Sequence, residues 1–127
     1  MGQPTSIALS GALVASPVPG TCSPSLHDRI DVSFTHSYTQ RISGSPSVNA
    51  TQDAPFVLPF GGVAKGRALV LRVRGGSLRA LITTPAGAAQ AIRISDLLVI
   101  HNPAEGDQLT AVSLIGTAEI EYLLAGD

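Results

Sequence analysis

Charged side chains are scarce in this 127-residue chain, at 13 % of residues, against about 25 % in typical soluble domains. The hydrophobic fraction of 44 % is ordinary for a globular protein. Because a small domain has much surface for its volume, that surface must here be built largely from Ser, Thr, Gly, Ala, Pro and apolar residues. Surfaces of this kind are often covered by another subunit. The composition therefore favours an oligomer or a larger assembly over a monomer.

Cysteine, tryptophan and long apolar runs are rare or missing. The one cysteine, Cys22, excludes an internal disulfide framework and is interpreted as an inert thiol. No apolar run approaches the roughly 18 residues of a membrane helix. The chain has no Trp, and aromatic residues make up only 4 %, which leaves little material for sugar-binding or base-stacking platforms. With a net charge of −1, neither nucleic acid nor a membrane is expected as a partner.

The first half of the chain shows one clear strand pattern. From Ile30 to Tyr38 every second residue is apolar, aromatic or His, and the residues between are Asp, Ser and Thr, which is typical of a half-buried strand. The Pro- and Ser-rich stretches 16–25 and 43–53 are predicted as loops, the first with the alternative of an extended arm. A helix over residues 5–15 is an open possibility.

The second half of the chain has a denser strand pattern. The Gly75–Gly76 pair is predicted to form a hairpin turn, because glycines adopt the positive φ angles that such turns need. Gly116–Thr117 is predicted to separate two strands. The apolar run Leu97–His101 is predicted to be a strand buried on both faces. The full set of strands predicted here is Ala68–Arg74, Ser77–Thr83, Ala88–Ile94, Leu97–His101, Gln108–Ile115 and Ala118–Leu124.

Strand count and turn spacing together predict the fold class. About seven or eight short strands punctuated by Gly and Pro indicate an all-β domain, as a β-sandwich, jelly roll or small barrel. We expect this single domain to span residues 30–127. Residues 1–29 are expected to form an N-terminal arm or loop-rich segment.

Charge is segregated along the chain. Residues 54–95 carry six basic and no acidic side chains, whereas residues 96–127 carry six acidic and no basic ones. In one interpretation, basic and acidic strands are neighbours in one sheet, where opposite charges contribute about 0.2–1 kcal/mol per pair. In the other, the charges face different subunits and set the register of an assembly. The candidate interface or register charges are Arg67, Arg72, Arg74, Arg79, Glu119 and Glu121.

Motifs that would carry catalysis or bind a cofactor are not recognisable in the sequence. Cys22 and His27 could supply two ligands to a zinc ion, but nothing nearby completes the set. There is no Gly-x-Ser-x-Gly elbow and no phosphate-binding glycine loop. His101 is expected to hold the turn at Asn102–Pro103. The expectation is a protein that is not an enzyme and has no catalytic, cofactor or metal residues.

Three segments of the second half resemble small β-proteins of tailed-bacteriophage virions, over roughly residues 56–127. They are Leu69–Gly76, Thr84–Gly87 and Gly116–Asp127, which share small residues, Thr/Ala/Gly-rich strands and few charges. The resemblance implies a capsid decoration (cement) protein, or a head–tail connector or tail component. Its partners would be further copies of itself, for example in a trimer, and virion proteins such as the major capsid protein. A tail-associated or lectin-like module that recognises a host glycan is the alternative.

Overall fold

The computed structural model describes the backbone of residues 5–15 and 28–127 and the side chains of residues 36–127. Over these residues the chain is all-β, as the sequence predicts, and contains no helix. The residues divide into two compact units, Ser6–Ser37 and a second unit that holds Tyr38–Asp127. The strands are β1 (Thr5–Ala15), β2 (Asp28–Tyr38), β3 (Gln40–Gly44), β4 (Ser47–Ala50), β5 (Phe56–Val57), β6 (Gly66–Arg74), β7 (Leu78–Thr83), β8 (Gln90–Ile94), β9 (Leu97–His101) and β10 (Ala111–Gly126).

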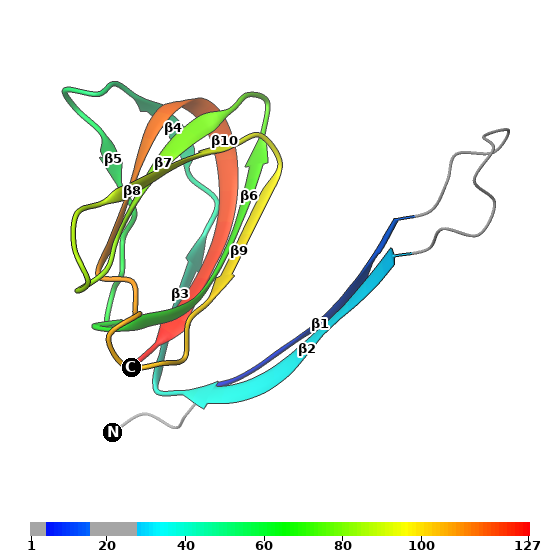
Figure 1. Ribbon diagram of the computed structural model, residues 1–127. Helices are drawn as coiled ribbons and strands as arrows, with labels where there is room; N and C mark the ends of the chain where they lie inside the picture. The colour runs from blue at the N-terminus through cyan, green and yellow to red at the C-terminus, as the bar shows by residue number, and fades with distance from the viewer. Residues whose placement is uncertain (1–4, 16–27) are drawn as a thin grey trace, which may run out of the picture. The chain divides into compact units, whose positions relative to one another are not determined.

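The first unit is a two-stranded sheet of β1 and β2, which run in opposite directions (Figure 1). The strand predicted over Ile30–Tyr38 is confirmed and begins two residues earlier, at Asp28. The possible helix over Thr5–Ala15 is wrong, because this segment pairs with β2 as a strand. Cys22, His27 and the loop predicted over residues 16–25 lie outside the described residues.

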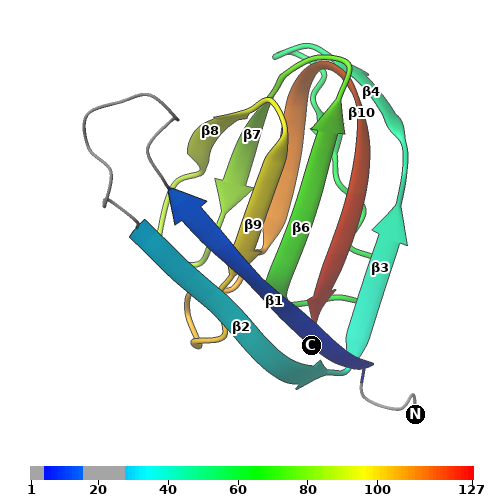
Figure 2. The ribbon, with the colours of Figure 1, turned by 90° about the vertical axis from the view of Figure 1, so that its right-hand side faces the viewer.

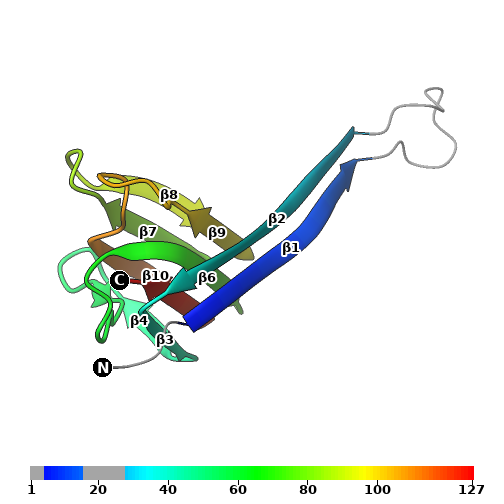
Figure 3. The same cartoon turned by 90° about the horizontal axis from the view of Figure 1, so that it is seen from below.

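The second unit is one eight-stranded sheet, curled into a half-barrel around the long strand β10. On one side of β10, strands β6 and β7 pair with successive parts of its length. Strand β9 then pairs with β6, and β8 pairs with β7. On the other side, β3, β4 and β5 pair with β10 in turn. Figure 2 shows β9, β6, β10 and β3 side by side, and Figure 3 shows β8 and β9 at one side of this unit and β3 and β4 at the other.

Glycines allow the connection between β6 and β7 to lie close against β10. Gly116 interrupts neither β10 nor its pairing, but it has a φ of 127°. A Cβ atom at Gly116 would lie 2.8 Å from the Ser77 carbonyl oxygen, and one at Gly76 would collide with the Thr117 carbonyl oxygen. Two predictions are therefore wrong. Gly116–Thr117 does not separate two strands, and Gly75–Gly76 is not a hairpin turn, since β6 and β7 both pair with β10.

Two further predictions about local structure are corrected. The segment predicted as a loop over residues 43–53 contains the end of β3 and all of β4, because β10 is long enough to pair with both. The segment Leu97–His101 is strand β9, as predicted, but it is not buried on both faces. Leu97 and Val99 are 53 % and 42 % exposed, and β9 ends the sheet.

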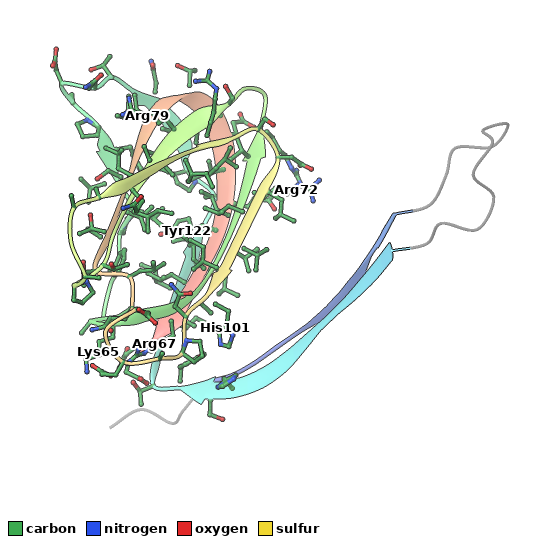
Figure 4. The ribbon with its side chains drawn as sticks, in the orientation of Figure 1. Lys65, Arg67, Arg72, Arg79, His101 and Tyr122 are labelled. Carbon is green, nitrogen blue, oxygen red and sulfur yellow. The ribbon has the colours of Figure 1, made fainter. Side chains whose placement is uncertain are left out.

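The core fills the concave side of the curled sheet and follows from the alternation of each strand. Leu69, Leu71 and Val73 of β6 are fully or almost fully buried, while Arg72 and Arg74 between and after them are exposed. Each buried Leu or Val contributes about 1.5–3 kcal/mol through removal of its surface from water. Tyr122 of β10 points into the same interior (Figure 4), where its ring lies against Gly44 of β3.

Candidate functional site

The ion pairs explain why charge is segregated along the chain. In the part of the chain whose side chains are described, each ion pair joins a basic residue of the segment 54–95 to an acidic residue of the segment 96–127. The pairs fall into two groups, one along the outer face of β6 and one at the end of the sheet where β6 begins. The interpretation that basic and acidic segments neighbour each other within one sheet is confirmed.

The first group is a charge ladder on the outer face of β6 and β10. In the antiparallel register, Arg72 lies opposite Glu121 and Arg74 opposite Glu119. Arg74 Nη1 lies 3.2 Å from Glu121 Oε1 on the diagonal, and Arg72 Nε lies 3.4 Å from Asp96 Oδ1. All these side chains are about half exposed or more, so water screens each pair and its contribution to stability is below about 1 kcal/mol.

The second group surrounds Arg67, which is 5 % exposed. Its Nη1 donates to the Ala104 carbonyl oxygen at 2.8 Å, and its Nη2 donates to Glu105 Oε2 at 2.7 Å. Asp127 Oδ2 lies 3.9 Å from Nε. Figure 4 shows Arg67 and Lys65 together at the end of the sheet opposite Arg79. Arg67 thus fastens the loop after β9 to the start of β6, and its side chain is not on the surface that a partner would meet.

Glu105 is held by two cations. Lys65 Nζ donates to its Oε1 at 2.9 Å, while Arg67 bonds its other oxygen. These hydrogen bonds lower the pKa of Glu105 below its usual value, and the bond from Lys65 has a larger effect than the bond from Arg67. The carboxylate is exposed, so this arrangement orders a surface loop.

His101 contacts Tyr38 beside this cluster. Tyr38 Oη lies 2.8 Å from His101 Nε2, and the two rings meet edge to face at 6.4 Å between centroids. Burial, and secondly the negative charge of Asp127, raise the pKa of Tyr38. The phenol therefore stays protonated at neutral pH and can donate to the imidazole. This contact joins His101 to Tyr38 of β2 and does not involve the turn at Asn102–Pro103, which His101 was expected to hold.

Two of the six predicted charges have no ion-pair partner among the described side chains. Glu119 lies opposite Arg74, but the short contact of Arg74 is with Glu121. Arg79 lies directly opposite Arg93 of β8, an arrangement of like charges that disfavours folding slightly. Arg93 donates only to Ser77 Oγ, at 3.3 Å. Arg79 and Glu119 are the predicted residues that remain available for a partner, and Arg93 joins them.

An apolar patch on the outer face was not foreseen from the sequence. It consists of exposed Leu97 and Val99 on β9, half-buried Val70 on β6, and half-buried Leu123 on β10, in adjacent rows of the sheet. A shallow depression beside it is lined by Val70, Arg72, Leu97, Glu121, Tyr122 and Leu123. The only sequence signal was the uncharged run of β9, which is equally typical of a buried strand.

The described side chains offer no group of three or more His, Cys, Asp or Glu placed to hold a metal ion. Among the same residues, no helix is long and apolar enough to span a lipid bilayer. Comparison of the chain with protein-family models, curated proteins and solved structures finds no match. Two surface features of the described side chains bear on function: the apolar patch, and the charges of Arg79, Arg93 and Glu119 that have no ion-pair partner.

Proposed function

We propose that the chain is a structural subunit of a larger assembly, and in particular a capsid decoration (cement) protein of a tailed-bacteriophage virion. It acts by covering surface and not as a catalyst. Its partners are further copies of itself and virion proteins such as the major capsid protein, which it joins after synthesis in the host cytoplasm. In the assembled form, residues 1–29 act as an arm toward a neighbouring subunit.

The outer apolar patch is the observation that carries this proposal. Leu97 and Val99 are each about half exposed and adjoin Val70 and Leu123, in a chain whose charged fraction is only 13 %. Large apolar side chains grouped on a strand at the border of a sheet are typical of surfaces that another chain covers. Arg79, Arg93 and Glu119 supply charges that the fold leaves for setting register with a partner.

The mass of the purified chain in solution tests this proposal, measured by light scattering at low and at high salt. We expect a dimer or larger species that persists at high salt, because the proposed contact is apolar and more than half of the described charged side chains are paired within the chain. A monomer at both salts contradicts self-assembly. Dissociation at high salt would assign the contact to the charges, and binding of a monomer to a glycan array would favour a lectin-like module.

A further inference from the structure

The free edge of β9 is a surface that fits a second copy of this chain. We propose that two copies pair antiparallel along β9, with a two-fold axis at Leu98, so that their curled sheets form one continuous sheet. This inference rests on the proposed self-assembly and gives it a specific geometry. Three observations support it: the hydrogen-bond phase of β9, the residues on the other edges of the sheet, and the charges that pairing would bring together.

The hydrogen-bond phase of β9 follows from the bonds at its two ends. Val73 N donates to the Asp96 carbonyl oxygen and Asn102 N donates to the Arg67 carbonyl oxygen, both at 2.7 Å. Because bonded and non-bonded pairs alternate in an antiparallel ladder, Leu98 bonds to β6. Leu97 and Val99, which lie opposite Arg72 and Val70, therefore direct their backbone N–H and C=O groups away from β6, toward the outer edge of the sheet.

The other edges of this sheet carry features that oppose pairing, and β9 does not. Strand β8 carries Arg93, and β3 carries Arg41. Between β4 and β5 the chain leaves the ladder over residues 51–55, which end in a proline. Charges, prolines and irregularities are the usual protections of sheet edges. Strand β9 contains no Asp, Glu, Lys, Arg or proline, which makes it the edge suited to strand addition.

Self-pairing about Leu98 uses the outward-facing backbone groups of Leu97 and Val99. It sets Leu97 opposite Val99 of the second copy and Val99 opposite Leu97, with Cα atoms about 5.5 Å apart as in a bonded antiparallel pair. The four exposed apolar side chains then lie together on the outer face. On the concave face, half-buried Leu98, which packs against the core, meets its own counterpart and extends that core.

Charge favours a second copy as the occupant, because this register opposes no like charges. The next residues along the edge place Asp96 of each copy opposite Ile100 of the other. Asp96 is also partnered by Arg72 of its own chain at 3.4 Å. Arg72 and Glu121 stay in the row behind Leu97, so the joined outer face has two neutralised charge ladders flanking one apolar centre.

Two double variants that differ only in the sign of one charge test the register. In L97E/V99E, each new carboxylate faces a carboxylate of the second copy, and we expect dimerisation to weaken at least about tenfold. In L97E/V99K, each carboxylate faces an ammonium group, and we expect a dimer that weakens with added salt. Both variants keep a carboxylate next to Arg72, and both replace exposed side chains, so thermal unfolding serves as the control that each is folded.

Sedimentation of the full-length wild type and both variants over a range of concentrations gives the result. A dimeric wild type, a monomeric L97E/V99E and a dimeric L97E/V99K support the inference. If the wild type is dimeric or larger but the two variants behave alike, the β9 register is wrong while self-assembly stands. If the wild type is monomeric at every concentration, both the inference and the proposed self-assembly are wrong.

Discussion

The two ends of strand β6 carry arginines of the same charge with different roles. Arg67 at the start is buried, and its guanidinium contacts the Ala104 carbonyl and the carboxylates of Glu105 and Asp127. Arg74 at the end is 58 % exposed in its side chain and makes one ion pair, with Glu121. A desolvated guanidinium cannot be rehydrated in place when a partner is lost, whereas an exposed one can. The difference teaches that an arginine–carboxylate pair stabilises the fold at the buried end of β6 and adds little stability at the exposed end.

The largest expected effect is at the buried end. Replacing Arg67 with Ala removes its hydrogen bonds and the packing of its aliphatic stem, and we expect the free energy of unfolding to fall by about 2–4 kcal/mol. Denaturant titration measures this. R67M is the matched variant that keeps most of the stem and isolates the loss of the charged hydrogen bonds. An R67A variant as stable as R74A would show that the two ends are equivalent after all.

Close backbone packing, and not charge, is expected to stabilise the contact between β10 and the β6–β7 connection that follows Arg74. G116A combines strain at a φ of 127° with a Cβ atom 2.8 Å from the Ser77 carbonyl oxygen, and should lower stability by about 1–3 kcal/mol. G75A is the control, because Gly75 also has a positive φ, 74°, but no atom lies within 4 Å of a Cβ there. Thermal unfolding should give a lower melting temperature for G116A than for G75A. The opposite order would contradict the close approach of Gly116 to the Ser77 carbonyl oxygen.

Low pH should destabilise the fold at the Arg67 end of β6, because protonation of Glu105 removes its charge. Because the pKa of Glu105 is lowered in the folded protein, its contribution is present in full above its ordinary value of about 4.5 and is lost as pH falls through the lowered folded value. Comparing wild type with E105Q by denaturant titration, we expect the stability difference to be largest near neutral pH and to vanish on acidification. A difference that is constant over pH would show that the charge of Glu105 does not matter.

The smallest effect is expected for the exposed pair at the other end. A double-mutant cycle of R74A and E121A should give a coupling energy below about 0.5 kcal/mol, which added salt reduces further. A coupling above about 1 kcal/mol would mean that the outer ladder stabilises the fold and would remove the contrast with Arg67.

The sequence predicted most strands of the second half and gave the ladder as one of two interpretations, because both depend on local alternation. Parity placed Arg72 and Arg74 on one face of their strand, and Glu119 and Glu121 on one face of theirs. The same parity separates Arg67 from Arg72 and Arg74 and groups it with Leu69, a signal of burial that charge alone concealed.

Features that depend on the whole sheet could not be predicted in this way. A Gly-Gly pair is compatible with a hairpin turn and with a connection between two strands that both pair with a third, and only the pairing of both flanking strands with β10 distinguishes them. An uncharged run such as β9 is equally typical of a central strand and of an unprotected edge. Position in the sheet, which arises from contacts distant in sequence, decides between these alternatives.

The central claim is that another copy of the chain covers the edge of β9. Hydrogen exchange of the Leu97 and Val99 amides in the full-length protein, followed as protein concentration rises, tests this most directly. We predict that both amides exchange rapidly in dilute solution and become protected at concentrations where the mass increases, while the Leu98 amide is protected throughout. Rapid exchange of Leu97 and Val99 at every concentration, in a protein whose mass does increase, would contradict the account.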